Sequence, residues 1–351
     1  MADSMIVEAL RKVVERQDLA REEAYRVMDV LTSGQATDAQ IAALLTAMRM
    51  KGETVEELCG FAQVMREKVT AVPTRHAVAA AVSGSGRQML VDTCGTGGDA
   101  KGTFNVSTAA AFVVAGAGIP VAKHGNRASS GLCGSADVVE ALGVHLELSP
   151  EQVGRCIDEV GIGFLFAPFL HTAMKYVMSA RRQIRIRTLF NILGPLTNPA
   201  RAAAQVIGVY DGALTEVMAS VLNQLGCRRA FVVHGVDGLD EISNVAETKI
   251  SEVQEGQVRT YYTRPEDFGM SRATLADLQG GDAAANAEII RQILQGSKGP
   301  KRDIVALNAG AAIAAGGGAA DIQEGIVAAE KSLDGGAALE RLEKLVAFCQ
   351  Q

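Results

Sequence analysis

Hydrophobic residues recur at helical spacing through the first 70 residues of the chain. Four apolar stripes are present, formed by Ile6, Leu10, Val13 and Val14, by Ala24, Val27, Met28 and Leu31, by Ile41, Leu44, Leu45 and Met48, and by Leu58, Phe61 and Met65. Gly34 ends the second stripe, and Thr37 and Thr54 each precede a Gln or Glu at the spacing of a capping box. The pattern predicts four short helices. Because four short helices bury little core among themselves, their stripes cover either a dimer partner or a second domain of the same chain.

Beyond Pro73 the pattern changes to short apolar runs that alternate with helical spacing. The runs are 90–91, 120–122, 164–166, 205–209 and 230–234, and the helical stretches between them are 107–116, 135–142, 150–160 and 214–225. Residues 249–253 and 258–262 are expected to form an antiparallel pair turning at Glu255 and Gly256. The fold class is therefore α/β, with a small N-terminal α-helical domain (1–74) and a larger α/β domain (75–351) around a central, mostly parallel sheet. Residues 75–87 are expected to cross between the two.

Composition narrows the class of protein. The chain has 351 residues, of which 48% are hydrophobic and 21% charged, which is ordinary globular usage. A formal net charge of −6 argues against an extended nucleic-acid surface, and no apolar run is long enough for a membrane span. The six cysteines show no metal-ligand spacing, so we expect reduced thiols and a cytoplasmic location.

A glycine-rich stretch at 92–99, DTCGTGGD, carries the first sign of chemistry. Apolar residues 89–91 are expected to form a short strand that runs into Gly95, Gly97 and Gly98, where backbone N–H groups converge with no side chain in the way. The turn suits a phosphate. It is neither a dinucleotide fingerprint, which has glycine where this chain has Ala100, nor a Walker P-loop, which is absent from the sequence.

Further segments follow in order: NVST at 105–108, KHGNR at 123–127, RTLFNILGPLTNP at 187–199, and Asp240 with Glu241. This ordered set resembles the anthranilate phosphoribosyltransferase family, and the likeness covers nearly the whole chain. The resemblance implies transfer of the phosphoribosyl group of phosphoribosyl pyrophosphate (PRPP) to the amine of anthranilate, with release of pyrophosphate, in tryptophan biosynthesis. It also implies that helices at about 168–187 join the small domain, and that the active site lies between the domains.

The resemblance further implies which residues bind each group, with Mg²⁺ as the cofactor and no catalytic side chain. Those implied for PRPP are Gly95, Gly98, Asp99, Thr103, Asn105, Val106, Ser107, Thr108, Lys123, His124, Gly125, Asn126, Arg127, Ala128, Ser129, Ser130, Gly131 and Ser135. Those implied for anthranilate are Gly95, Asn126 and Arg181, and those for the metal are Ser107, Asp240 and Glu241. Lys123 and Arg127 are expected directly after a strand, at the carboxyl edge of the sheet where α/β ligands bind.

The chain departs from the family pattern at three positions. Leu132 and Cys133 stand where the family commonly has lysine and serine, which removes two side chains from the phosphate loop. Arg185 replaces a usual glycine. It lies four residues after Arg181, so on a continuous helix the two arginines would share a face.

Two other functions fit parts of the sequence. A pyrimidine nucleoside phosphorylase has a similar architecture, but its glycine loop differs and it does not need Asp240 and Glu241. A non-catalytic paralogue that binds nucleic acid is disfavoured by the acidic balance and by Asn126 and Arg181. The expected partners are thus small substrates, with no nucleic acid or membrane, and a second copy of the chain bound through the N-terminal helices.

Overall fold

The computed structural model describes residues 2–76, 88–99, 101–128 and 131–350. The predicted crossover at 75–87 lies almost wholly outside them. Within the described part, no helix is long and apolar enough to cross a bilayer.

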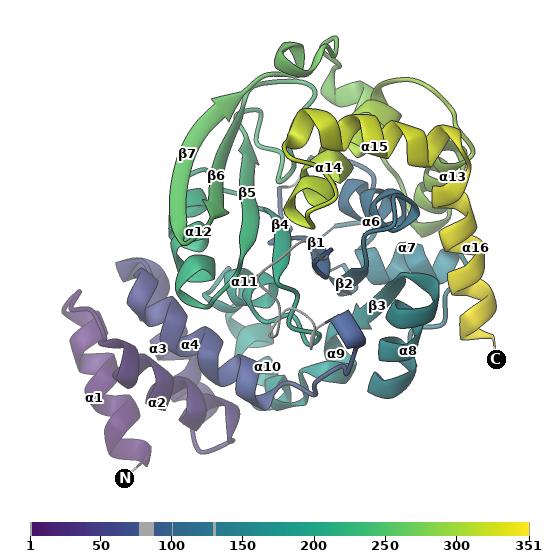
Figure 1. Cartoon of the computed structure of the whole chain (residues 1–351). Helices are drawn as coiled ribbons and strands as arrows, with labels where there is room; N and C mark the ends of the chain where they lie inside the picture. Colours follow the sequence, from purple (N-terminus) through teal and green to yellow (C-terminus); the bar gives the residue numbers. More distant parts are fainter. Residues whose placement is uncertain (1, 77–87, 100, 129–130, 351) are drawn as a thin grey trace.

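The chain begins with the four predicted helices, which lie together at one end of the molecule (Figure 1). They are α1 (Ala2–Val14), α2 (Arg21–Thr32), α3 (Asp38–Lys51) and α4 (Val55–Lys68). Both predicted capping boxes form: the hydroxyls of Thr37 and Thr54 accept hydrogen bonds from the N–H groups of Gln40 and Glu57. α2 and α4 pack closely because Gly60 has no side chain, and a Cβ there would lie 2.3 Å from the carbonyl oxygen of Arg21.

The centre of the molecule is a seven-stranded sheet within the described residues, in the order β3-β2-β1-β4-β5-β6-β7. The strands are β1 (Val91–Gly95), β2 (Val121–Gly125), β3 (Ile162–Phe166), β4 (Ala204–Gly208), β5 (Arg229–Gly235), β6 (Thr248–Gln254) and β7 (Gln257–Thr263). The first five are parallel, and β6 and β7 form the predicted antiparallel pair. Glu255 and Gly256 both have positive φ, as expected of a two-residue hairpin turn.

Helices cover both faces of the sheet (Figure 1). The long helices are α6 (Val106–Gly116), α8 (Pro150–Val160), α12 (Leu214–Gln224), α13 (Ala283–Leu294), α14 (Pro300–Ala315), α15 (Ile322–Asp334) and α16 (Ala337–Cys349). α6 and α14 pack on one face, where Phe231 and Val233 of β5 belong to their core, and α12 packs on the other, where Ala230 and Val232 point. This second core continues into α1–α4, so the apolar stripes of the bundle are buried in a core that the four helices share with the chain's own α/β part.

Short elements connect β3 to β4. They are α9 (Ala167–Leu170), η1 (Thr172–Met174), α10 (Lys175–Ile184), α11 (Phe190–Leu193) and η2 (Gly194–Leu196). α10 packs against α3 and α2, so this segment returns to the helical bundle before the chain re-enters the sheet. The remaining short elements are α7 (Ser135–Ala141), η3 (Pro265–Phe268) and η4 (Leu275–Leu278).

The first strand differs from its prediction. It was expected at 89–91, but β1 runs from Val91 to Gly95 and includes residues that the sequence placed in the glycine turn. The reason is that the buried polar side chains of Asp92 and Thr93 form hydrogen bonds with Asn198 and with the carbonyl oxygen of Ser107, and apolar periodicity does not detect a strand of that kind.

Candidate active site

Two glycines let an acidic loop approach the ends of neighbouring strands. Gly95 ends β1 and Gly208 ends β4, and the two are register partners. A Cβ on Gly208 would lie 1.6 Å from the carbonyl oxygen of Asp240, and a Cβ on Gly95 would lie 2.8 Å from its Oδ2. The N–H of Gly97 donates to that same Oδ2 over 3.1 Å. Glycine at these positions therefore brings the predicted metal ligand Asp240 into the glycine loop.

Three carboxylates meet there: Asp99, Asp240 and Glu241. Burial, and then the charge of Asp99, raises the pKa of Asp240 to about 7. Burial, and then the charge of Asp240, raises the pKa of Glu241 well above its usual value, and burial raises that of Asp99. The Oδ2 atom of Asp99 is buried without a hydrogen-bond partner. Asp240 and Glu241 are the one or two carboxylates that Mg²⁺ uses together with phosphate oxygens, and its charge would relieve their repulsion.

The start of α6 joins this cluster. The N–H of Ser107 donates to Oε1 of Glu241 over 3.2 Å, as the positive end of a helix dipole favours. The Asn105 side chain does not cap the helix; its Nδ2 donates to the carbonyl oxygen of Cys133, and its Oδ1 accepts from Asn286. Val106 and Thr108 are buried within the first turn. Thus, of the four residues 105–108, Ser107 is the one hydrogen-bonded to a predicted metal ligand.

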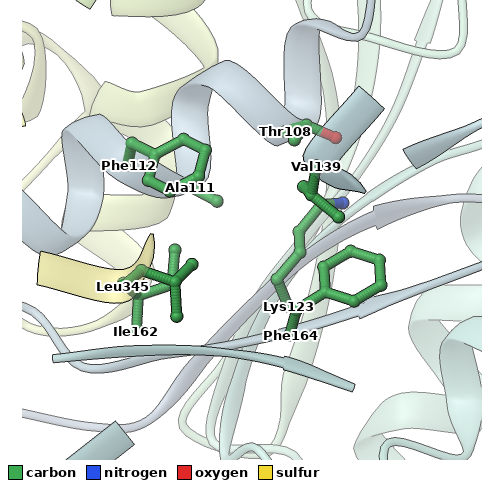
Figure 2. A pocket seen from close by; sticks show the side chains of 8 residues that line it. All are labelled: Thr108, Ala111, Phe112, Lys123, Val139, Ile162, Phe164 and Leu345. Atoms are coloured by element: carbon green, nitrogen blue, oxygen red, sulfur yellow. The ribbon is translucent and has the colours of Figure 1, made fainter. Parts of the chain in front are cut away.

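Lys123 is not placed as predicted, because it lies inside β2 rather than after it, and it is buried. Figure 2 shows its side chain running past Phe164 and Val139 toward Thr108, beside a void of only about 10 Å³. The ammonium group donates to the carbonyl oxygen of Thr93 and, over 3.3 Å, to Oγ of Ser107. The charge of this lysine offsets part of the rise in the pKa of Glu241, so Lys123 supplies positive charge next to the carboxylates.

His124 belongs to a buried hydrogen-bond network. The main-chain N–H of His124 donates to Oδ1 of Asp92. The other oxygen, Oδ2 of Asp92, accepts from Nδ2 of Asn198 over 2.7 Å. The Nε2 atoms of His124 and His171 lie 3.2 Å apart. Burial lowers the pKa of His124 to about 3 and that of His171 to about 4, so both rings are neutral at pH 7. A neutral ring whose Nε2 faces another histidine is better suited to holding strands in place than to proton transfer.

The loop after β2 is held by α7. Oγ of Ser135 donates to the carbonyl oxygen of Asn126, and the N–H of Ala128 donates to Oδ2 of Asp137 over 3.0 Å. Arg127 was expected to favour ligand binding, but its guanidinium forms ion pairs with Asp137 and Glu140. The charge of Arg127 is thus matched by acids in this structure.

The other predicted PRPP residues are placed around this loop. Gly125 lies where a Cβ would be 2.3 Å from Oγ of Ser135, Gly131 is exposed, and Thr103 forms a β-bridge with Gln279. Leu132 is 82% exposed, so it leaves that part of the loop open to solvent. Ser129 and Ser130 lie outside the described residues.

Arg187 is a site residue to which the sequence assigned no role. Its Nη2 donates to the carbonyl oxygen of Gly98, and its guanidinium stacks over the ring of Tyr210 at 4.3 Å. Gly98 has φ of +84°, and a Cβ there would lie 2.5 Å from the guanidinium. The only sign in the sequence was the place of Arg187 in the segment 187–199, because the contact spans 89 positions.

Arg181 lies on α10 and is partly buried. Its Nη1 lies 3.9 Å from Sδ of Met178, its guanidinium lies over Phe190, and burial lowers its pKa. It forms no ion pair with any described residue. The expectation that Arg185 shares its face is wrong, because α10 ends at Ile184 and Arg185 adopts the left-handed conformation with φ of +52°.

Comparisons with known proteins agree with this architecture. Two models of the glycosyl transferase family match, the helical bundle domain over residues 7–69 and the a/b domain over residues 87–339. The anthranilate phosphoribosyltransferase of Geotalea uraniireducens is 55% identical over 349 residues, which covers 97% of this chain and 99% of that protein.

Two solved structures are similar along almost their full length. That of anthranilate phosphoribosyltransferase from Thermus thermophilus has a TM-score of 0.89 at 43% identity, covering 98% of this chain and 99% of the other. The enzyme from Saccharomyces cerevisiae in complex with PRPP and Mg has a TM-score of 0.87 at 26% identity, covering 99% and 98%. The chain therefore belongs to the anthranilate phosphoribosyltransferases, which are pentosyltransferases of the glycosyl transferase family.

Proposed function

We propose that this chain transfers the phosphoribosyl group of PRPP to anthranilate at the carboxyl edge of the sheet, where Asp99, Asp240 and Glu241 meet the glycine loop. The observation that carries the proposal is this crowding of carboxylates beside a helix N-terminus. Like charges this close are costly in the free protein, and a cation with a polyphosphate would relieve the cost.

The magnesium ligands would be Asp240, Glu241 and the hydroxyl of Ser107. The described residues hold no group of three or more His, Cys, Asp and Glu arranged for a metal, so phosphate oxygens would complete the coordination. When bound, Mg²⁺ would neutralise the charge of the pyrophosphate leaving group. The yeast relative binds both PRPP and Mg.

The chain's own groups would position the two substrates. Backbone N–H groups of the glycine loop would hold the phosphates of PRPP, and the positive end of α6 and the charge of Lys123 would favour their negative charge. Holding the anomeric carbon and the amine in contact removes the entropic cost of bringing them together, so neither a covalent nucleophile nor a titrating histidine is needed.

Arg181 is the proposed anthranilate residue. A partly buried guanidinium without a carboxylate partner is suited to binding the carboxylate of an aromatic acid in two hydrogen bonds. The contacts of His171 with His124 and of Arg187 with Gly98 tie the segment that carries Arg181 to the glycine-loop edge at two points.

One assay tests the function. Anthranilate fluorescence should fall when PRPP and Mg²⁺ are added, and it should be unchanged when PRPP is omitted. Cleavage of thymidine by phosphate, without any use of anthranilate, would contradict the proposal and favour a nucleoside phosphorylase.

A substitution tests the anthranilate site. Arg181→Ala should raise the KM for anthranilate by about 10- to 150-fold, the loss expected for a charge-assisted hydrogen bond, with little change in the KM for PRPP. Arg185→Ala is the matched control and should leave both values near wild type. If Arg185→Ala raises the anthranilate KM and Arg181→Ala does not, the residue has been assigned wrongly.

The chain is also proposed to be a cytoplasmic homodimer. All six cysteines are free thiols, in keeping with a reducing compartment. Val14 at the end of α1 and Met50 near the end of α3 are 66% and 71% exposed, which supports a contact between copies through this part of the bundle. Sedimentation should give about twice 36.8 kDa; an active monomer would contradict it.

A further inference from the structure

A pocket of about 600 Å³ lies at the opposite edge of the sheet from the glycine loop. It is lined by Ala203 and Gln205 at the start of β4 and by Arg228 just before β5, whereas the glycine loop follows the end of β1 beside the end of β4. α4 forms its other wall through Gln63 and Arg66. The pocket therefore lies between the helical bundle and the α/β part, and its size is that of a small-molecule site.

Its lining is strongly basic, although the whole chain has a net charge of −6. The charged groups are Arg21, Arg66, Arg201, Arg228 and Glu67. Glu67 is the one acid among these described lining residues, and its carboxylate is bonded to Tyr25 and Gln63 rather than to an arginine. Positive charge concentrated in a concave surface raises the local concentration of anions.

Arg66 and Arg21 are held in place by neutral acceptors, and neither forms an ion pair within the described residues. Arg66 donates to the carbonyl oxygens of Leu196 and Leu225 over 2.7 and 3.0 Å, which fixes its guanidinium between the two parts of the chain. Arg21 donates to Oε1 of Gln224 over 3.2 Å. Neutral acceptors satisfy N–H groups but leave the positive charge unbalanced.

Arg201 adds a second charge beside Arg66. It is exposed, makes no side-chain hydrogen bond or ion pair within the described residues, and has φ of +52°, a conformation that costs a side-chain-bearing residue energy. Burial and then the nearby charge of Arg201 are among the causes that lower the pKa of Arg66. Two guanidinium groups that repel each other across a pocket form a ready receptor for an anion.

We infer that this pocket binds a small phosphate-bearing molecule, with Arg66 and Arg201 as its main contacts. Arginine forks match the oxygens of a phosphate. Gln63, Gln205 and Gln224 also line the pocket, and the Nε2 of each is held by an acceptor within the protein. Because the ligand would touch α4 and the start of β4 together, its binding would hold the helical bundle against the α/β part. The inference does not depend on the proposed reaction.

The test uses inorganic phosphate as the probe and the full-length protein without substrates. Thermal unfolding is followed as phosphate is added, and apparent affinity is taken from the rise in Tm. Arg201→Gly removes the guanidinium while suiting the positive φ, so the fold should be kept. We expect it to weaken the phosphate effect about tenfold or more, the loss of one charge-assisted contact.

Matched variants decide the outcome. Arg201→Glu should abolish this part of the response, and Arg259→Glu, on exposed β7, should behave as wild type. Phosphate bound at the glycine loop contributes equally to all four proteins and cancels in the comparison. Equal phosphate responses in wild type and Arg201→Gly would overturn the inference. A response to citrate but none to phosphate would also overturn it, because the site would then select carboxylates.

Discussion

Glu57 in the helical bundle and the carboxylates at the glycine-loop edge are all held away from water, but they are paired differently. In the bundle, Glu57 is fully buried, forms an ion pair with Lys51 at 2.9 Å and accepts hydrogen bonds from the N–H groups of Leu19 and Thr54. At the glycine loop, Asp99 and Asp240 face each other and one oxygen of Asp99 has no partner. Complete pairing indicates that Glu57 stabilises the fold, whereas the unpartnered oxygen of Asp99, beside a glycine loop and a helix N-terminus, is an acceptor suited to a ligand.

The largest expected effect is a loss of folding stability when the buried carboxylate of Glu57 is removed. Glu57→Ala would leave the ammonium of Lys51 with Asp18 and the carbonyl oxygen of Gly52, and would remove the acceptor for two N–H groups. Breaking a buried pair in this way costs roughly 3–5 kcal/mol of unfolding free energy. Urea unfolding measures the loss, while kcat of the folded fraction should be unchanged. A stability equal to wild type would show that the bundle does not depend on this pair.

The next largest effect is expected at Asp240, where a substitution should reduce activity and leave stability intact. Asp240→Asn keeps the shape of the side chain but removes a proposed metal ligand, so kcat should fall roughly 100-fold, with a higher Mg²⁺ requirement. Stability without metal should not fall, because the substitution removes a charge that repels Asp99. Activity assays over a Mg²⁺ series and urea unfolding give the two readings. Wild-type activity in excess chelator would remove the basis for a metal at this edge.

The same contrast explains how much the sequence could predict. Capping boxes at Thr37 and Thr54 are local, and the four helices and the hairpin at Glu255 and Gly256 follow from spacing alone. Contacts at the active site join residues that are far apart in the sequence, and local spacing cannot predict them. For example, Gly97 donates a hydrogen bond to Asp240, 143 positions away. The ordered segments identified the site residues by resemblance only. Their geometry, including the strand position of Lys123, needed the fold.

A third, smaller effect tests the contact between Arg187 and the glycine loop. Gly98→Ala would place a Cβ 2.5 Å from the Arg187 guanidinium at a φ of +84°, so the arginine must shift and the loop must strain. The KM for PRPP should rise about tenfold, the value of one charge-assisted hydrogen bond. Gly98→Ala combined with Arg187→Ala removes the clash but not the backbone strain. If the double variant recovers wild-type KM, the clash alone is responsible and the bond to Gly98 has no role.

The smallest effect concerns the end of α10, where the expectation from helical spacing was wrong. Arg185 follows the last residue of the helix with φ of +52° and ψ of +30°, and its N–H bonds to the carbonyl oxygen of Arg181 over 3.2 Å. Glycine is favoured at this position because a side chain there costs about 1–2 kcal/mol.

Arg185→Gly should therefore raise the free energy of unfolding, but by less than the roughly 1–2 kcal/mol of backbone strain that it removes. Glycine also increases the conformational entropy of the unfolded chain, which lowers stability by about 0.5–1 kcal/mol. The net rise in the free energy of unfolding, measured with urea, should therefore be about 0.5–1 kcal/mol. Arg182→Gly is the matched control, since Arg182 is exposed within the helix. There the same replacement should cost about 1 kcal/mol. Opposite signs at positions three residues apart would show that α10 ends at Ile184 in solution. A loss of stability in both variants would mean that the helix continues through Arg185, and the two arginines Arg181 and Arg185 would then share a face after all.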